Sequence, residues 1–447
     1  MKAYCNSPKS FAFVIVMYAV VIIGIGSIAT AAAIENWIVV GTVPDWPPPV
    51  WTSQTRAGEV ITVEEDEPGV QVNYYSYVTG WSWNIGGIRA LSRGYVDPVY
   101  GPTIYVGLGW GYVDVRTPLA NGFTPPTTTC FAGLWNAPYY DGICTVGMKP
   151  NGDFLCGVGG GETVGGGEVY LYALKKTNLT HGAPDITGEY ANTTLRGAYG
   201  GDFLDLTEIE SISNDTIVVA LSNQVYLADG YDMYDPASGG LVLTSEFSGV
   251  RGISFESRVN AMAVTPTGLV VSGLSSGYID VRAMSDFGTV LASTTLPSKI
   301  NELEILPNGN IVAGLNNGDV KVLSVGLAVL DSNNFGGPIA GLAATVKGNV
   351  AIGTGNLLYV RSGSNLALDG DMSPGSAGVD MGNPIGALTA ISLTPGNCGD
   401  AIALGYGLKT DLNGDCRINF ADFAMFMQQI WGRCMDPANA NCEHPWE

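Results

Sequence analysis

The sequence predicts an all-β fold in which four-stranded sheets repeat along the chain. One observation is the composition. Of 447 residues 61 are Gly, 14% are charged and 46% are hydrophobic, which suits short strands joined by tight turns around a buried core. The other observation is an internal repeat, clearest in residues 259–282, 300–323 and 339–361. These copies start about 40 residues apart, which is the spacing of the blades of a β-propeller.

Each repeat carries the signals of strands and turns in the same order. In the copy VNAMAVTPTGLVVSGLSSGYIDVR, apolar residues dominate 259–264 and 269–272. The step PTG separates these two strands, because Pro fixes φ and Gly permits the positive φ that tight turns use. SSG then predicts a hairpin into a third strand, and a variable stretch at 289–293 supplies a fourth. Four strands make one blade, which buries both faces only beside other blades.

The predicted number of blades depends on further, less regular copies of the repeat. They begin at Ile143 and Leu206, a half-copy occupies residues 101–116, and LTAISLTPGN begins at Leu388. We therefore predict a β-propeller of six or seven four-stranded blades. With seven blades, residues 37–43 would add a strand to the last blade and close the ring.

These repeats, which cover residues 85–395, resemble the broad group of WD40-like and quinoprotein-like propellers. The resemblance implies the architecture and leaves the function open. VDVR or IDVR stands where true WD40 blades end in Trp-Asp, and the S-x-D-x-G-x-x-W boxes of sialidase-like propellers are absent from the sequence.

The first 33 residues predict export. Lys2 and Lys9 precede an almost wholly apolar run at 11–28, and the small residues at 29–33 supply a cleavage site, as in a secretory signal peptide. The alternative is an uncleaved membrane anchor, because the run is nearly long enough to span a bilayer. Both alternatives make the rest of the chain secreted or displayed at the cell surface, and after cleavage we expect no membrane contact. The net charge of −21 argues against nucleic acid as a partner, because phosphates would be repelled.

Export also predicts disulfides, because exported chains meet oxidising conditions. Cys434 and Cys442 bracket a short loop, and we expect them to pair. Cys398 with Cys416 is the second predicted pair. The remaining cysteines of the exported part have no assigned partner: Cys130, Cys144 and Cys156.

Residues 34–84 predict aromatic-rich strands that precede the first blade and would help to close the propeller. Strict alternation within NYYSYVTGWSW places four aromatic side chains on one strand face. That face could stack sugar rings or pack inside the protein, and packing is the favoured interpretation because aromatic side chains mostly serve as buried apolar surface. The four residues are Tyr75, Tyr77, Trp81 and Trp83.

The sharpest motif is DLNGDCRINFAD at residues 411–422. Ca²⁺ takes about six to eight oxygen ligands, and a short loop supplies them from alternating positions. The side chains of five residues and the backbone carbonyl of Arg417 match that spacing. Residues 420–431 then predict a helix, because apolar residues recur at spacings of three and four. The predicted metal ligands are Asp411, Asn413, Asp415, Arg417, Asn419 and Asp422.

This loop and helix resemble half of a type I dockerin, as found in exported proteins of planctomycete-like bacteria. Asp422 at the last ligand position matches dockerins, whereas an ordinary EF-hand has Glu there. The chain departs from the family at Cys416, where Gly is usual, and at Phe420 and Ala421, where a polar pair contacts the cohesin partner. A second calcium loop is not recognisable. The resemblance implies a linker at 396–410, a module at 411–447 that binds Ca²⁺, and a cohesin-like or cell-envelope protein as partner.

No catalytic residues are predicted. The sequence has two histidines, His181 and His444, which excludes most His-based triads and multi-His metal sites. Residues 157–168 are Gly-rich but lack the Lys-Ser/Thr ending of a phosphate loop, and they predict a long hairpin. Paired carboxylates could still cleave glycosidic bonds, but no spacing marks a pair among the candidates Glu162, Glu168, Asp185, Asp202 and Asp205.

We therefore expect a secreted or cell-surface binding or scaffold protein, without catalysis. Its propeller would present a face to a carbohydrate or protein ligand, and its calcium-binding module would tether it. The alternative, implied by the dockerin resemblance alone, is a polysaccharide-degrading hydrolase or lyase. A third hypothesis is a structural protein that associates with itself when Ca²⁺ is present.

Overall fold

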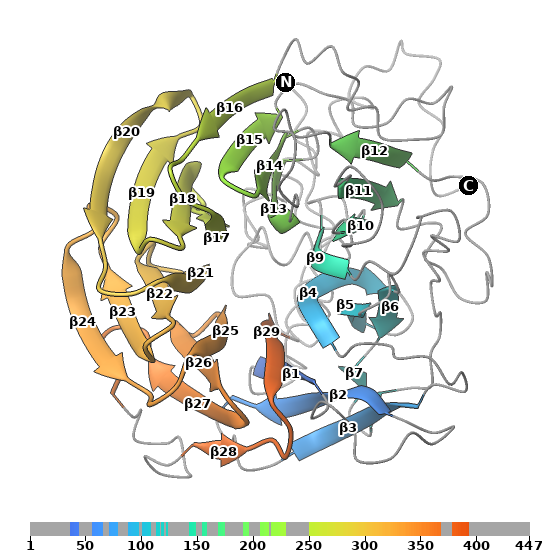
Figure 1. Ribbon diagram of the computed structural model, residues 1–447. Coiled ribbons are helices and arrows are strands. Elements are labelled where there is room, and N and C mark those ends of the chain that lie inside the picture. Colours follow the sequence, from blue (N-terminus) through green and yellow to red (C-terminus); the bar gives the residue numbers. More distant parts are fainter. Residues whose placement is uncertain are drawn as a thin grey trace, which may run out of the picture. The chain divides into compact units, whose positions relative to one another are not determined.

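A computed structural model describes parts of the chain that all belong to one compact unit, which begins at Asn36. Among these residues the secondary structure consists of strands and turns without a helix, so the predicted all-β class is confirmed (Figure 1). The described residues are 36–43, 56–65, 71–78, 88–97, 101–108, 113–116, 118–119, 122–123, 143–148, 154–158, 169–174, 191–195, 206–213, 216–228, 250–367 and 378–392.

The three clearest repeats each form one antiparallel four-stranded sheet in which the strands follow chain order. The first comprises β17 (Val259–Val264), β18 (Leu269–Leu274), β19 (Tyr278–Ala283) and β20 (Asp286–Thr295). The second comprises β21 (Ile300–Ile305), β22 (Ile311–Leu315), β23 (Asp319–Leu323) and β24 (Val329–Asn334). The third comprises β25 (Ile339–Ala344), β26 (Asn349–Thr354), β27 (Leu357–Ser362) and β28 (Val379–Asp380).

The looser repeats also form sheets. One comprises β13 (Leu206–Ser213), β14 (Thr216–Leu221), β15 (Gln224–Ala228) and β16 (Val250–Ser254). Another comprises β9 (Ile143–Met148), β10 (Phe154–Val158), β11 (Val169–Leu174) and β12 (Ala191–Leu195). A three-stranded sheet comprises β4 (Ile88–Asp97), β5 (Gly101–Leu108) and β6 (Val113–Arg116), and a small pair comprises β7 (Pro118–Leu119) and β8 (Gly122–Phe123).

The last sheet combines strands from distant parts of the sequence. β29 (Ile385–Ser392) pairs with β1 (Asn36–Thr42), which is followed in the sheet by β2 (Arg56–Glu64) and β3 (Gln71–Val78). The two strands β1 and β29 are antiparallel, from the pair Asn36 and Ser392 to the pair Thr42 and Ile385, and they lie side by side in Figure 1, blue beside red-orange. The strand expected from residues 37–43 therefore does join the last repeat. The aromatic segment supplies β3 at the sheet edge, while Trp81 and Trp83 lie outside the described residues.

The turns of the clear repeats follow the predicted chemistry. Between β17 and β18 the amide of Gly268 donates to the carbonyl of Thr265 at 2.9 Å, with a φ of +79° at the glycine. Between β18 and β19, Gly277 has a φ of +83°. Glycine reaches such angles without the steric cost that a β-carbon imposes, so PTG and SSG are tight turns as expected.

Neighbouring sheets contact one another through their innermost strands. The innermost strand is the first strand of its sheet along the chain, except in the last sheet, where it is β29, the strand that comes last along the chain. Contacts join β29 to β4, β4 to β9, β9 to β13, β13 to β17, β17 to β21, β21 to β25 and β25 to β29. The core lies between the sheets. For example, one apolar cluster joins the sheets that begin at β17 and β21 and includes Val271, Ile279, Ile300, Ile311 and Ala313.

A bulge at the second residue of the innermost strands links consecutive sheets. The ladder register shifts past Thr207, Asn260 and Asn301, and bulges redirect the extra residue. Each of these side chains donates to the first carbonyl of the next innermost strand. The Thr207 hydroxyl reaches Val259 at 3.0 Å, the Asn260 amide reaches Ile300 at 3.1 Å, and the Asn301 amide reaches Ile339 at 3.0 Å.

A second contact also recurs from sheet to sheet. A glycine on the second strand of one sheet lets the first side chain of a neighbouring innermost strand pack directly against the backbone. A β-carbon at that glycine would lie 2.5–2.9 Å from the Cγ2 atom of the isoleucine, closer than such atoms approach in proteins. The pairs are Gly273 with Ile300, Gly314 with Ile339, Gly353 with Ile385 and Gly41 with Ile88.

Candidate functional site

The innermost strands of the seven sheets line one cavity of about 640 Å³. The strands β4, β9, β13, β17, β21, β25 and β29 all contribute to its wall. Ligand pockets in proteins commonly enclose about 300–1,000 Å³. The cavity is therefore large enough for a small organic molecule, and it is the candidate functional site.

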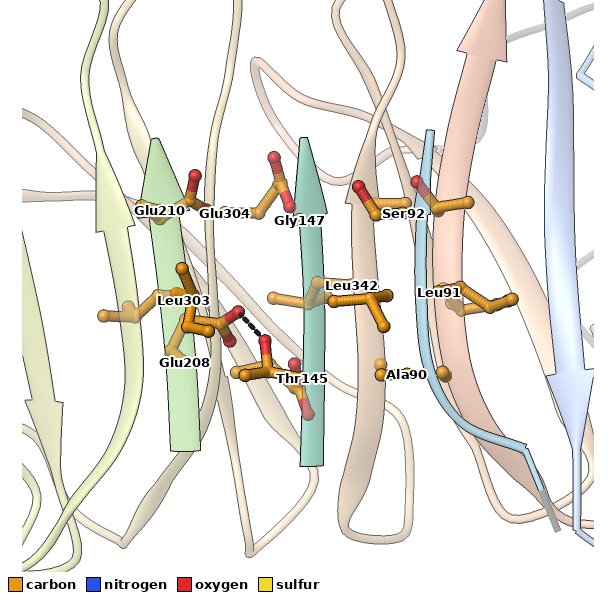
Figure 2. A pocket seen from close by; sticks show the side chains of 18 of the residues that line it. Ala90, Leu91, Ser92, Thr145, Gly147, Glu208, Glu210, Leu303, Glu304 and Leu342 are labelled. Atoms are coloured by element: carbon orange, nitrogen blue, oxygen red, sulfur yellow. Dashed lines mark hydrogen bonds between the residues drawn. The ribbon is translucent and has the colours of Figure 1, made fainter. Parts of the chain in front are cut away.

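Side chains occupy this wall in levels, because the strands hold equivalent positions in register. Figure 2 shows Leu91, Leu303 and Leu342 at one level of the cavity. These residues are the fourth of their strands in β4, β21 and β25. The levels on either side hold the third and fifth residues. The partly exposed Leu91 and the buried Leu303 and Leu342, which pack in the core between the sheets, separate these two levels.

Four glutamates provide most of the charge in the cavity wall. Glu208 and Glu210 lie on β13, and Glu302 and Glu304 lie on β21. Within each strand the two acids are two residues apart, so they share a strand face. Figure 2 shows Glu210 and Glu304 at one level and Glu208 at the other. Arg93 on β4 also lines the cavity.

Small residues stand at the equivalent positions of the neighbouring strands. The third and fifth residues are Ala261 and Ala263 in β17 and Gly341 and Ala343 in β25. Gly341 and Ala343 line the cavity and fill little volume, which leaves room for carboxyl groups within it, whereas Ala261 and Ala263 are buried in the core between the sheets. Each glutamate is partly exposed, and its exposed part faces a space that protein surrounds.

Burial in this wall shifts the carboxyl groups toward the neutral form, because a protein-lined space solvates an anion poorly. It raises the pKa of Glu208 from 4.5 to about 7, although the Thr145 hydroxyl donates to its Oε1 atom at 3.0 Å and opposes the shift. Burial likewise raises the pKa of Glu304 to about 8. The cavity therefore holds protonated carboxyl groups near neutral pH.

The other two carboxyls are affected by repulsion as well as burial. Burial first, and then repulsion from Glu208 and Glu304, holds the pKa of Glu210 well above its ordinary value. The same causes raise the pKa of Glu302, where attraction by Lys299 opposes them. Because the four acids interact, they titrate as one coupled group rather than as separate sites. Such a group can accept or release protons and can bind a cation or a hydroxyl-rich molecule.

Two further buried carboxylates serve contacts within the protein. Glu65, which follows β2 and is 1% exposed, accepts from the Thr345 hydroxyl at 2.5 Å and from the Asn349 amide at 2.8 Å. This contact joins the last sheet to the turn between β25 and β26. Asp280 in β19 is fully buried and pairs with Arg282 at 2.7 Å. Both interactions stabilise the sheets and lie outside the cavity wall.

No metal centre is formed by the part of the chain that the structure describes. Within it, no three His, Cys, Asp or Glu side chains lie close enough together to hold a metal ion. The six predicted Ca²⁺ ligands at 411–422 lie outside the described residues, as do both histidines and the five acidic candidates between 162 and 205. Cys156 is buried on β10 and forms no disulfide with another described cysteine.

Sequence reasoning missed the four glutamates, although the repeats contain a signal for them. The aligned innermost strands read LTEIES and INELEI in β13 and β21, but VNAMAV and IAGLAA in β17 and β25. Acids thus replace small residues at two equivalent positions in alternate repeats. Taken one strand at a time, the alternation of acid and apolar residues resembles an ordinary solvent-facing strand. Only a comparison of the repeats would have distinguished acids that line a cavity from those of a solvent-facing strand.

Comparison with known proteins does not assign this chain to a family: no protein-family model matches it, and no curated protein is similar in sequence. Among the described residues no helix is long and apolar enough to cross a membrane.

Proposed function

We propose that this chain is a secreted or cell-surface binding protein, a seven-bladed propeller that holds a small ligand in its central cavity. One observation carries the proposal: innermost strands from seven sheets line the same cavity. Contacts between consecutive innermost strands, including β25 with β29 and β29 with β4, support a closed ring. The glycine contact of Gly41 with Ile88 supports it too, because it repeats the packing found between the regular sheets.

The chemistry of the wall favours a small organic cation as ligand. Carboxylates pair with ammonium and guanidinium groups through charge-assisted hydrogen bonds. The partly exposed side chain of Leu91 in the cavity wall would contact the carbon skeleton of such a molecule. A protein-lined cavity also strengthens the attraction between opposite charges relative to water.

A panel of small molecules tests this proposal. Isothermal titration of the mature chain with primary amines, quaternary amines, guanidines, neutral oligosaccharides and organic anions should give saturable binding with cations. Replacement of Glu302 by Gln should weaken that binding at least tenfold, whereas Glu256→Gln, an exposed position, should leave it unchanged. Binding of neutral sugars alone, or of no compound, would contradict the assignment.

The second part of the proposal is that the C-terminal module binds Ca²⁺ and tethers the propeller to a cohesin-like or cell-envelope protein. It is supported by the ligand spacing at residues 411–422. Asp411→Ala or Asp422→Ala should each weaken Ca²⁺ binding strongly, as measured by calorimetry. Unchanged affinity in both variants would reject the ligand assignment. A pull-down from the native cell envelope with the module as bait identifies the partner.

A catalytic alternative is favoured by one observation, the raised pKa values of Glu208 and Glu304. Glycoside hydrolases use one protonated and one ionised carboxyl group at the scissile bond, and burial is the usual means of keeping an acid protonated. Incubation with plant and algal polysaccharides, followed by an assay of reducing ends, tests this alternative. Robust turnover that Glu208→Gln abolishes would replace the binding function by catalysis.

A further inference from the structure

We propose that the four cavity glutamates form a proton-operated switch, which holds the innermost strands together when neutral and pushes β13 and β21 apart from their neighbours when ionised. The proposal deepens the proposed function because it regulates the same cavity. Its test needs no ligand, however, so either idea can fail without the other.

The geometry places like charges where the protein offers little to neutralise them. Glu208 and Glu210 on β13 are separated from Glu302 and Glu304 on β21 by a single strand, β17, and all four line one cavity. Among the described residues Glu208 has a side-chain donor, Thr145. The same part of the chain gives Glu210 and Glu302 no hydrogen-bond donor.

The elements packed against β13 and β21 bring few other charges. Described side chains of β9, β14, β17, β18, β22 and β25 include no ionisable group, and β10 contributes the buried thiol of Cys156. Two cations are near: Lys299, which precedes β21 and acts on Glu302, and Arg93 in the cavity wall. Two cations do not balance four carboxylates, so full ionisation leaves a net negative cavity.

The direction of the pH effect follows from proton linkage. The pKa of Glu208 is raised to about 7 and that of Glu304 to about 8, from an ordinary 4.5. The folded state therefore holds protons that the unfolded chain releases, and this favours folding fully only below the unfolded pKa. Stability from these groups falls as pH rises from 4.5 and is lost once pH passes about 8.

Ionisation also changes what the cavity accepts. A neutral carboxyl group has no charge to offer an organic cation. An ionised carboxylate attracts the cation, and the bound cation reduces the repulsion between the carboxylates. Capture of a cation should therefore increase over the pH interval in which the empty protein loosens. The switch couples ligand capture to the pH of the medium outside the cell.

The stability of the empty protein tests the switch. Urea denaturation at pH 6 and pH 9 compares the wild type with Glu208→Gln/Glu304→Gln and with the exposed control Glu256→Gln. For the wild type the folded-to-unfolded ratio should fall at least tenfold, because one acid with a pKa of about 7 contributes roughly that factor. The control should follow the wild type. The double variant should show a fall at least tenfold smaller, because Glu208 and Glu304 no longer titrate, while the raised pKa values of Glu210 and Glu302 leave part of the pH dependence. An equal pH dependence in the double variant would overturn the proposal.

A measurement on the wild type keeps the proposal falsifiable if the double variant does not fold. Carboxylic acids and carboxylates have separate infrared bands. At pH 6.5 ordinary glutamates are ionised, so a protonated-acid band should persist in the folded protein and disappear on unfolding. Its absence from the folded protein at pH 6.5 would overturn the switch, and failure of every ligand titration would overturn the binding proposal alone.

Discussion

Removal of the Arg282 guanidinium should destabilise the protein more than removal of the whole ion pair. Asp280 in β19 has a fully buried side chain, and its Oδ2 atom accepts from Nε of Arg282 at 2.7 Å. The Nη1 atom of Arg282 also donates to the carbonyls of Phe287 and Gly288, at 3.2 and 3.0 Å. Replacement by Met keeps much of the apolar stem but leaves a buried carboxylate without a cation.

The size of the effect follows from the cost of an unpaired buried charge. Breaking a buried pair by removing one partner costs about 3–5 kcal/mol, and we expect about 3 kcal/mol because the Arg282 side chain is 12% exposed. Burial already raises the pKa of Asp280 against the opposing effect of Arg282, and loss of the arginine raises it further. The folded variant then retains a proton that the unfolded chain releases, so the defect grows as pH rises.

Urea denaturation at pH 5 and pH 8 measures this effect. Arg282→Met should lose more stability at pH 8 than at pH 5, and Asp280→Asn/Arg282→Met should recover part of the loss because no buried charge remains. An exposed control, Glu256→Gln, should stay within about 0.5 kcal/mol of the wild type. A loss below about 1 kcal/mol in the single variant, or an equal loss in the double variant, would refute the reasoning.

Three further substitutions test the contacts between sheets, each by urea denaturation at pH 7. Gly314→Ala should cost about 2–3 kcal/mol, the upper part of the usual range for overpacking, because its β-carbon would lie 2.6 Å from Ile339. Gly309→Ala has open space around it and should cost about 1 kcal/mol for its positive φ. Equal losses would contradict the packing argument. Asn301→Ala should cost about 1 kcal/mol because the carbonyl of Ile339 loses its donor. An unchanged midpoint of urea denaturation would contradict this role of Asn301. Glu65→Ala should cost about 2–3 kcal/mol, since two buried donors lose their acceptor. A loss no larger than that of Asn301→Ala would contradict the role of Glu65 in joining the last sheet to the turn between β25 and β26.

Local patterns in the sequence predicted the sheets well, because they depend on neighbouring residues. The PTG and SSG steps specified tight turns, and Gly268 and Gly277 adopt the positive φ that those turns use. The pairing of β1 with β29 was also predictable. The last repeat, which begins at Leu388, is incomplete, and residues 37–43 form a strand that precedes the first repeat. The turns follow from local turn chemistry, and the pairing of β1 with β29 follows from the incomplete repeat.

The cavity could not be predicted in the same way, because it depends on the register between strands from different repeats. Nothing in β13 alone shows that Glu208 and Glu210 share a space with Glu302 and Glu304 of β21. The bulges at Thr207, Asn260 and Asn301, which help to set that register, depend on carbonyls 52, 40 and 38 residues further along the chain. Acid pairs were therefore expected among residues 162–205 and not within β13 and β21.

An engineered cross-link between the two ends of the repeat region most directly tests the claim that seven sheets surround one cavity. Val39 in β1 faces Thr389 in β29, and directly opposed strand residues are close enough for a disulfide. Oxidised Val39→Cys/Thr389→Cys protein should contain a peptide pair joined at these positions, identified by mass spectrometry. The out-of-register pair Val39→Cys/Ile385→Cys should not cross-link. Failure of the first pair to link in folded protein, or equal linkage of both, would contradict the seven-sheet arrangement.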